Sequence, residues 1–289
     1  MSERKLYSPR VIKEIIDEYG FAFSKSLGQN FLIDKNIIDK ICDGAEIKES
    51  DQIIEVGPGI GTLTQELCKR ARKVVAIEID KNLYPILNDN LSSYDNFHLV
   101  QGDVLKIDLN TLISDYFDND GEIKVVANLP YYITTPIIMK LLEEKIRVNK
   151  IVVMVQKEVA LRMRAKPGTK DYGALSIAVQ YYSKPQIIVN VPKNVFMPRP
   201  NVDSAVIMLN VYEKPIVKVE DEKFLFKIIK AAFGKRRKTL VNALNSSQLG
   251  IAKEDIISIL NECNIDVKAR AEDLSLDEFA KITNSILSK

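Results

Sequence analysis

Short apolar runs alternate with amphipathic segments through the first half of the chain. Five runs rich in Val and Ile are typical of buried strands, and helical spacing of apolar residues separates them. These runs span residues 52–56, 73–79, 97–100, 123–127 and 150–156. Strands that alternate with helices predict an α/β fold, in which a parallel sheet carries helices on both faces and binds ligands beyond the carboxyl ends of its strands.

Two further strand-like runs, at 186–190 and 204–211, follow a predicted helix at 174–182. A proline-rich stretch separates them, and no helical pattern lies between the two. Consecutive strands without a crossover helix favour an antiparallel pair, which we expect to close the sheet.

The two ends of the chain differ from this α/β segment. The first residues are basic and include a helical pattern, and Asp34 is the expected N-cap of the next helix. After Lys214-Pro215 only helical patterns remain, the last of them with Ser275 as its expected N-cap. We therefore expect a basic N-terminal arm over 1–23, an α/β domain over 24–213 and a small all-helical domain over 214–289.

The cysteines and the histidine of the chain bear on whether it has a metal site or a histidine-activated nucleophile. The 289 residues include three well-separated cysteines, Cys42, Cys68 and Cys263, and one histidine, His98. This spacing matches neither a disulfide framework nor a zinc site, and the histidine has no ligand partner nearby in the sequence. We expect no metal site and no histidine-activated nucleophile.

No apolar run approaches the length of a membrane span, and the first residues lack the apolar segment of a secretion signal. The sequence therefore predicts a cytoplasmic protein without membrane contact.

Basic residues cluster in two places, although 41 basic and 39 acidic side chains nearly cancel overall. One cluster is the block Lys235-Arg236-Arg237-Lys238. The other is a looser set formed by Lys157, Arg162, Arg164, Lys166 and Lys170. Such clusters neutralise phosphates in nucleic-acid-binding proteins, whereas each one alone is more often a solvated helix face.

Three alternating glycines, Gly57, Gly59 and Gly61, follow the strand-like run at 52–56. We call residues 57–61 the glycine loop. Glycine lets the backbone turn tightly and lets a ligand approach, and the next helix directs free N–H groups at that ligand. The spacing is one residue shorter than the dinucleotide fingerprint. A turn that needs glycine for steric reasons alone remains the alternative.

Acidic residues stand at the ends of the next two predicted strands. Glu78 lies about 20 residues beyond the glycine loop, where a carboxylate accepts the hydroxyls of a ribose. Asp103 lies one strand over, placed to accept from an adenine amino group. Acids also gather at strand ends because those ends meet solvent, but two beside the glycine loop favour a nucleoside-containing cofactor.

The strand-like run at 123–127 leads into Asn128-Leu129-Pro130-Tyr131. Asn128 offers a neutral acceptor, Pro130 fixes the direction of the preceding carbonyl, and Tyr131 offers a flat face for stacking. The combination suits the amino group of a nucleobase. An ordinary turn is the alternative, but the position at the mouth of the sheet favours an active site.

The chain resembles the S-adenosylmethionine-dependent N6-adenine methyltransferases in four motifs. These are Gly57-Pro58-Gly59-Ile60-Gly61, Glu78, Gly102-Asp103 and Asn128-Leu129-Pro130-Tyr131. The segments 27–32 and 194–204 narrow the resemblance to the bacterial type of small-subunit (16S) ribosomal RNA adenine N6,N6-dimethyltransferases. The similarity extends over residues 24–245.

The resemblance implies a Rossmann-like class I methyltransferase sheet over 24–213 with S-adenosyl-L-methionine as the cofactor. It also implies the site residues. Asn30, Leu32, Gly57, Gly59, Glu78, Asp103 and Asn128 would bind the cofactor, and Asn128, Leu129, Tyr131 and Phe196 would hold the target adenine. For Phe196 the sequence pattern alone favours a core aromatic.

The implied reaction transfers methyl groups to N6 of two adjacent adenosines in the 3′-terminal hairpin of 16S rRNA, within the immature 30S subunit. Nothing in the sequence demands a dimer, so we expect a monomer. If Asn128 and the Leu129 carbonyl both accept from the adenine amino group, its lone pair is aimed at the methyl group, so orientation and electrostatics carry catalysis.

Three alternatives stay open. One is the related 23S rRNA adenine dimethyltransferase that confers antibiotic resistance, and another is a nucleotide-dependent dehydrogenase, which the short glycine spacing disfavours. The third is an assembly factor whose main role is to bind the immature small subunit.

Overall fold

The computed structural model describes residues 4–24, 26–235 and 237–288. They form two compact units. Unit 1 runs to Ala160 and also includes Gln186–Val211, and unit 2 consists of Leu161–Pro185 and the chain from Tyr212 onward. The expected boundary at 214 lies next to Tyr212, whereas Leu161–Pro185 groups with the C-terminal segment although its sequence lies inside the expected α/β domain.

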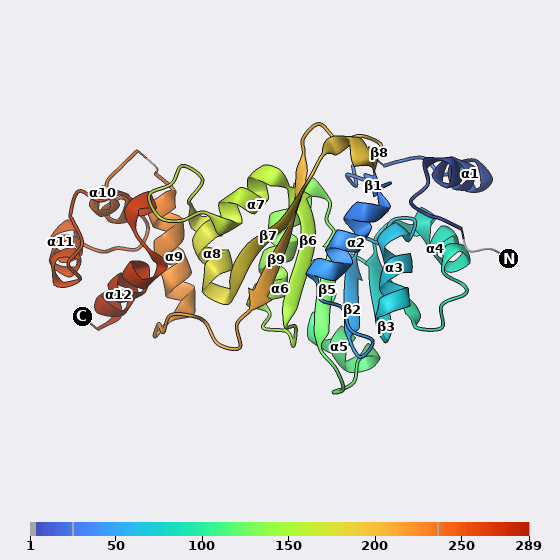
Figure 1. Cartoon of the computed structure of the whole chain (residues 1–289). Coiled ribbons are helices and arrows are strands. Elements are labelled where there is room, and N and C mark those ends of the chain that lie inside the picture. The colour runs from blue at the N-terminus through green and yellow to red at the C-terminus, as the bar shows by residue number, and fades with distance from the viewer. Residues whose placement is uncertain (1–3, 25, 236, 289) are drawn as a thin grey trace. The chain divides into compact units, whose positions relative to one another are not determined.

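A seven-stranded sheet in the described part of the chain has the order β4-β3-β2-β5-β6-β9-β7 (Figure 1). Its strands are β2 (Gln52–Val56), β3 (Lys73–Glu78), β4 (Phe97–Gln101), β5 (Ile123–Asn128), β6 (Lys150–Gln156), β7 (Ser183–Val191) and β9 (Ser204–Val211). The apolar runs therefore locate every strand of this sheet, with differences of one to three residues at some ends.

The pairing confirms the predicted α/β class. Strands β2, β3, β4, β5 and β6 pair in parallel, so their carboxyl ends meet at one edge. Strand β9 runs antiparallel to β6, with Val153 opposite Ile207. The order reverses at β2, which lies between β3 and β5, and such a switch point is where open α/β sheets bind ligands.

Helices cover both faces of the sheet in unit 1, because all five residues of β2 are buried although their side chains alternate between faces. On one face Ile53, Val74 and Val126 pack with Ile41 and Leu67 from two of these helices. The helices that begin in unit 1 are α1 (Pro9–Tyr19), α2 (Lys35–Gly44), α3 (Thr62–Arg70), α4 (Tyr84–Asn90), α5 (Leu109–Tyr116), α6 (Thr134–Glu143) and α7 (Lys157–Arg164), with short 3-10 helices at Lys81–Leu83, Tyr131–Ile133 and Lys193–Val195.

The N-terminal segment packs into unit 1. Leu6, Ile12 and Ile15 are fully buried in a hydrophobic cluster that includes Ile60 of the glycine loop. The amphipathic helix over 9–19 is confirmed as α1. The expected basic arm is not basic overall, because residues 1–23 carry four basic and four acidic side chains. Its apolar stripe contributes a second core beside the glycine loop.

A two-stranded sheet links two distant segments. Strand β1 (Phe31–Leu32) pairs antiparallel with β8 (Phe196–Met197), and Leu32 lies opposite Phe196. Two-residue strands carry no periodic signal, so this pairing was not expected.

The C-terminal part of unit 2 is helical, as predicted. The Asp221, Thr239 and Ser275 side chains each accept from a backbone N–H in the first turn of the helix they cap. The helices of this unit are α8 (Ala174–Tyr182), α9 (Glu222–Phe233), α10 (Leu240–Asn245), α11 (Lys253–Glu262) and α12 (Leu276–Leu287), with a 3-10 helix at Ala271–Asp273.

The basic side chains of the looser set are exposed, and so are Lys235, Arg237 and Lys238 of the block. Arg236 lies outside the described residues. The looser set and these three side chains of the block are therefore accessible to solvent.

Among the described helices, none combines the length and apolarity that a bilayer crossing needs.

Candidate functional site

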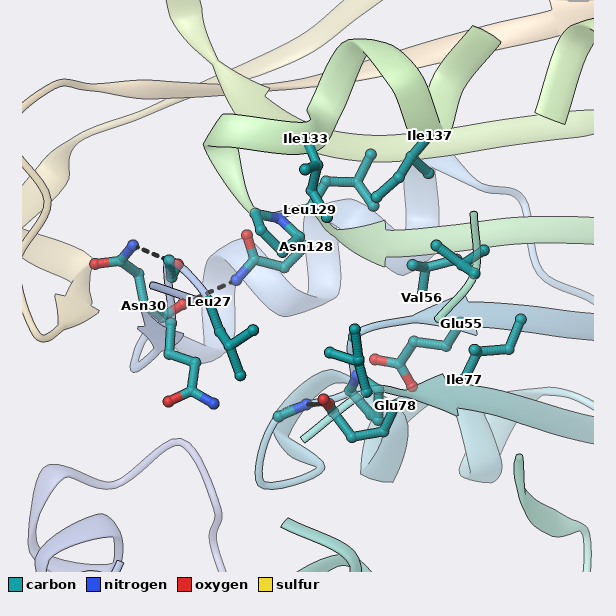
Figure 2. Close-up of a pocket in the computed structure, with 18 of the residues that line it drawn as sticks. Leu27, Asn30, Glu55, Val56, Ile77, Glu78, Asn128, Leu129, Ile133 and Ile137 are labelled. Atoms are coloured by element: carbon teal, nitrogen blue, oxygen red, sulfur yellow. Dashed lines mark hydrogen bonds between the residues drawn. The ribbon is translucent and has the colours of Figure 1, made fainter. Parts of the chain in front are cut away.

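A cavity opens at the carboxyl ends of β2, β3, β4 and β5 (Figure 2). It is covered by residues 27–32, which lead into and form β1 and are called the covering segment below. Nine of the predicted site residues line it. They are Asn30, Leu32, Gly57, Gly59, Glu78, Asp103, Asn128, Leu129 and Tyr131. The structure thus brings together residues that are up to 101 positions apart in the sequence.

The glycine loop forms one wall of the cavity. Gly57 and Gly59 adopt φ angles of 70° and 63°, in the left-handed region that favours glycine. A Cβ atom at Gly59 would lie 2.9 Å from the ring of Phe31, so this glycine is required by the close packing of β1. A Cβ atom at Gly57 would meet nothing within 4 Å, so Gly57 instead leaves open space beside the strand end.

Glu78 ends β3 and is 5% exposed. Its carboxylate accepts from the backbone N–H of Gly59 at 3.3 Å and from that of Asp80 at 2.8 Å, which fixes its direction at the cavity. Burial raises the pKa of Glu78 to about 7, against the opposing effect of those backbone hydrogen bonds. The group therefore titrates near neutral pH.

Asp103 follows β4 and Gly102, and it lines the cavity beside the end of β3. Its Oδ1 accepts from the backbone N–H of Leu105 at 3.0 Å, so the loop itself orients the carboxylate. The two predicted acids therefore lie on one cavity wall, at the ends of adjacent strands.

Asn128 ends β5, across the cavity from Glu78 (Figure 2). Its Nδ2 donates to the backbone carbonyl of Asn30 at 3.0 Å. Because that bond uses the donor side of the amide, the Oδ1 atom is left as its acceptor side. The segment that covers the cavity therefore orients the amide predicted to bind adenine.

Leu129 and Tyr131 are held by neighbouring strands. The backbone N–H of Leu129 donates to the Met154 carbonyl of β6 at 3.1 Å, and the Leu129 side chain is 1% exposed. The Tyr131 hydroxyl lies 2.6 Å from Ser204 Oγ, at the start of β9. Tyr132, which the sequence did not single out, also lines the cavity and is 57% exposed.

The covering segment is fastened by a side chain that the sequence analysis did not select. Gln29 Nε2 donates to Asp80 Oδ2 at 2.6 Å, and Gln29 Oε1 accepts from the backbone N–H of Ser24 at 2.7 Å. Asp80 is only two residues beyond Glu78. Gln29 therefore ties the loop that carries Asn30 to the strand end that carries the predicted ribose acceptor.

Phe196 does not line the cavity. Its side chain is 3% exposed and lies in the hydrophobic cluster that also contains Leu32. The physical reason is the pairing of β8 with β1, which places Phe196 directly behind a cavity residue. The role of Phe196 against the adenine stays a prediction.

Glu55 is a second side chain that the sequence analysis missed. It lies inside β2, lines the cavity and is 1% exposed. An acidic residue within an otherwise apolar strand was the available signal, since an acid is rarely buried without a specific reason.

The side chains present suit a cationic nucleoside cofactor. Glu78 and Asp103 provide carboxylate acceptors for hydroxyl and amino groups, and Gly57 leaves space beside them. Oε2 of Glu55 is a buried oxygen that has no hydrogen-bond partner in the described part of the chain. No group of three His, Cys, Asp or Glu side chains among the described residues is arranged to hold a metal ion.

Comparison with known proteins identifies relatives of nearly full length. A family model described as ribosomal RNA adenine dimethylase matches residues 20–287. A protein of Clostridioides difficile (strain 630) named ribosomal RNA small subunit methyltransferase A is 59% identical over 286 residues, which cover 99% of this chain and 98% of that one. A protein of the same name from Alkaliphilus metalliredigens (strain QYMF) is 55% identical over 285 residues, with 99% of each chain covered.

Solved structures support the same fold. A dimethyladenosine transferase from Plasmodium falciparum superposes with a TM-score of 0.73 at 28% identity, over 87% of this chain and 95% of that one. The 23S rRNA methyltransferase ErmE gives a TM-score of 0.66 at 24% identity, over 88% and 98% of the two chains. The second likeness concerns the fold alone.

Proposed function

This chain belongs to the ribosomal RNA adenine dimethylase family, and from that premise we propose its reaction and substrate. It is an S-adenosylmethionine-dependent methyltransferase that modifies N6 of two adjacent adenosines in the 3′-terminal hairpin of 16S rRNA, giving N6,N6-dimethyladenosine. Its substrate is the immature 30S subunit, and it acts as a monomer in the cytoplasm. Relatives named for the small subunit favour this substrate over 23S rRNA.

The proposal rests mainly on the position of Asn128, which lines the same cavity as Glu78 and Asp103 and is oriented by the segment that covers it. Its Nδ2 is held by the Asn30 carbonyl, and its Oδ1 is left to accept from an adenine amino group. Glu78 and Asp103 line the other side, where they would hold the ribose and adenine of the cofactor. When bound, S-adenosylmethionine supplies an electrophilic methyl group on its sulfonium.

Asn128 and Leu129 act on the nucleophile. The amino nitrogen of adenine is weakly nucleophilic because its lone pair is delocalised into the ring. Two acceptors, Asn128 Oδ1 and the Leu129 carbonyl, would hold the amino group pyramidal and direct its lone pair at the methyl carbon. No general base is needed before attack, since the nitrogen loses its proton readily once it is cationic.

Tyr131 and Phe196 would flank the extruded base. Adenine must leave its stack to reach a cavity at the sheet edge, and aromatic faces stabilise an unstacked base. The Tyr131 ring is held by Ser204, and Phe196 lies behind Leu32 in the pair formed by β1 and β8.

The experiment is to map methylated adenosines in both ribosomal RNAs. We expect 16S rRNA from cells lacking the protein to lose N6,N6-dimethyladenosine at two adjacent positions, as measured by mass spectrometry and primer extension. The purified protein with labelled S-adenosylmethionine should restore both on immature 30S subunits. Loss of methylation in 23S rRNA instead would contradict the proposal.

A growth comparison tests the alternative of an assembly factor. A strain with a catalytically inactive variant is grown beside a deletion strain, which separates the role of methylation from the role of binding.

A further inference from the structure

Glu55 is a cavity residue to which the reaction described above gives no role. It is the penultimate residue of β2, it is 1% exposed, and its Oε2 has no hydrogen-bond partner within the described ranges. An ionised carboxylate in such a site is strongly disfavoured unless a partner or a positive charge accompanies it. The side chain therefore either stays neutral or meets a cationic ligand.

Among the described residues, the groups that interact electrostatically with Glu55 supply no positive charge. They are Glu78 from β3, Thr64 and Cys68 from α3, and Cys42 from α2. Burial raises the pKa of Glu55 to about 8, the neighbouring Thr64 hydroxyl lowers it, and the Glu78 charge raises it further. Burial also raises the pKa of both thiols, that of Cys42 to about 12, so the thiols are neutral at pH 7. Glu55 is therefore mainly protonated there.

The sheet order shows where Glu55 lies relative to the residues proposed to hold the cofactor and the adenine. Strand β2 lies between β3 and β5, so Glu55 lies on the strand between Glu78 and Asn128. In the proposed function Glu78 holds the ribose of the cofactor, and Asn128 holds the amino group that attacks the methyl carbon. A sulfonium bound between these two groups would lie near the end of β2.

We propose that Glu55 senses the charge of the cofactor: it ionises when a sulfonium enters the cavity and takes a proton back once the sulfur is neutral. This inference rests on the proposed function. Glu55 exchanges its proton with solvent and is not a base for adenine. During transfer the N–CH3 bond forms, the S–CH3 bond breaks with its electron pair left on sulfur, and the methylated nitrogen loses its proton to solvent.

The physical reason is the difference of one positive charge between S-adenosylmethionine and S-adenosylhomocysteine. Inside a cavity of low dielectric an ionised Glu55 stabilises the sulfonium, whereas a protonated Glu55 is matched to the thioether. Loss of the charge on transfer returns Glu55 to its neutral form. The residue thereby distinguishes the substrate form of the cofactor from the product form.

Proton release on the wild-type protein is the first test. Titration calorimetry at pH 7 in phosphate and in Tris, two buffers with different ionisation enthalpies, gives the protons exchanged for each ligand. We expect S-adenosylmethionine to release about one proton more than S-adenosylhomocysteine, because only the first requires Glu55 to ionise. Equal proton release for the two ligands, zero included, overturns the inference.

Two matched variants separate Glu55 from the neighbouring acid. We expect Glu55→Gln, a neutral isostere of the protonated side chain, to raise the Kd of S-adenosylmethionine about tenfold and to change that of S-adenosylhomocysteine by less than about twofold. Glu78→Gln should weaken both ligands to a similar extent, because both carry the same ribose. If Glu55→Gln weakens the two ligands equally, Glu55 does not sense charge.

Two outcomes distinguish the role of Glu55 from the methyl-transfer reaction itself. Wild-type protein that binds S-adenosylmethionine without the extra proton release excludes the role of Glu55 and leaves the reaction intact. Wild-type protein that binds neither ligand contradicts the proposed function itself. Thermal unfolding of both variants without ligand verifies that they fold.

Discussion

The hydroxyl of Tyr131 lies 2.6 Å from Ser204 Oγ, which ties the segment after β5 to the first residue of β9. Ser204 is fully buried, so its position is fixed by the sheet. The contact therefore holds the Tyr131 ring, the flat face proposed for the target adenine, by a strand more than 70 residues away in the sequence.

We expect Tyr131→Phe and Ser204→Ala each to lower kcat/KM for rRNA by roughly 2- to 10-fold, since each loses one hydrogen bond worth about 1 kcal/mol. The double variant should lose no more than either single one, because both remove the same bond. Tyr131→Ala, which removes the ring, should lose more, given that a stacked base is worth about 1–3 kcal/mol. Additive losses in the cycle would show that the contact does not position the ring.

Asn128→Ala should lower methyl transfer by about a hundredfold or more, because the acceptor that orients the amino group is lost. Cofactor binding should largely persist, since Glu78 and Asp103 remain. A tritiated-methyl assay and calorimetry with S-adenosylmethionine measure the two effects. Full activity of this variant would remove Asn128 from the mechanism.

Gln29→Ala should raise the Kd of the cofactor about tenfold, mainly through faster dissociation, because the bond from Gln29 to Asp80 holds the segment that covers the cavity. Stopped-flow measurement of cofactor release tests this. The exposed Gln186 provides a matched control, and Gln186→Ala should release the cofactor at the wild-type rate. An unchanged rate in Gln29→Ala would show that the segment is held by its other contacts.

The affinity for S-adenosylhomocysteine should fall as the pH drops below about 7. Burial raises the pKa of Glu78 to about 7, and only its ionised form accepts from both ribose hydroxyls. Protonation therefore weakens binding by up to about tenfold per pH unit below that pKa, while the affinity levels off above it. Calorimetry across neutral pH measures this profile, and Glu78→Gln should flatten it. A wild-type profile that is already flat would mean that Glu78 does not bind the ribose.

Phe196→Leu separates packing from stacking. The substitution keeps an apolar side chain behind Leu32, so we expect a loss of unfolding free energy of only about 1 kcal/mol. Activity on rRNA should fall about tenfold or more if the ring also faces the adenine, as we propose. Chemical denaturation and kcat/KM give the two numbers. Unchanged kcat/KM would leave Phe196 a core aromatic alone.

The sequence alone was enough to predict the strands and the polar candidate site residues that follow them. Apolar runs of Val and Ile locate the strands because a strand buried on both faces needs apolar residues at every position. The polar residues that directly follow such runs, Glu78 and Asn128 among them, must then meet at one sheet edge, since parallel strands end on the same side. Helix caps such as Asp34 and Ser275 are also local, because the capping bond joins residues two or three apart.

Contacts between distant segments were decided only by the tertiary structure. The pairing of Leu32 with Phe196, the bond from Gln29 to Asp80 and the bond from Asn128 to Asn30 each join groups more than 50 residues apart. No periodicity encodes such partners, because they depend on how the whole chain packs. The same holds for Glu55: the sequence places an acid in β2, but the rise of its pKa to about 8 follows from burial, which only the assembled sheet and helices impose.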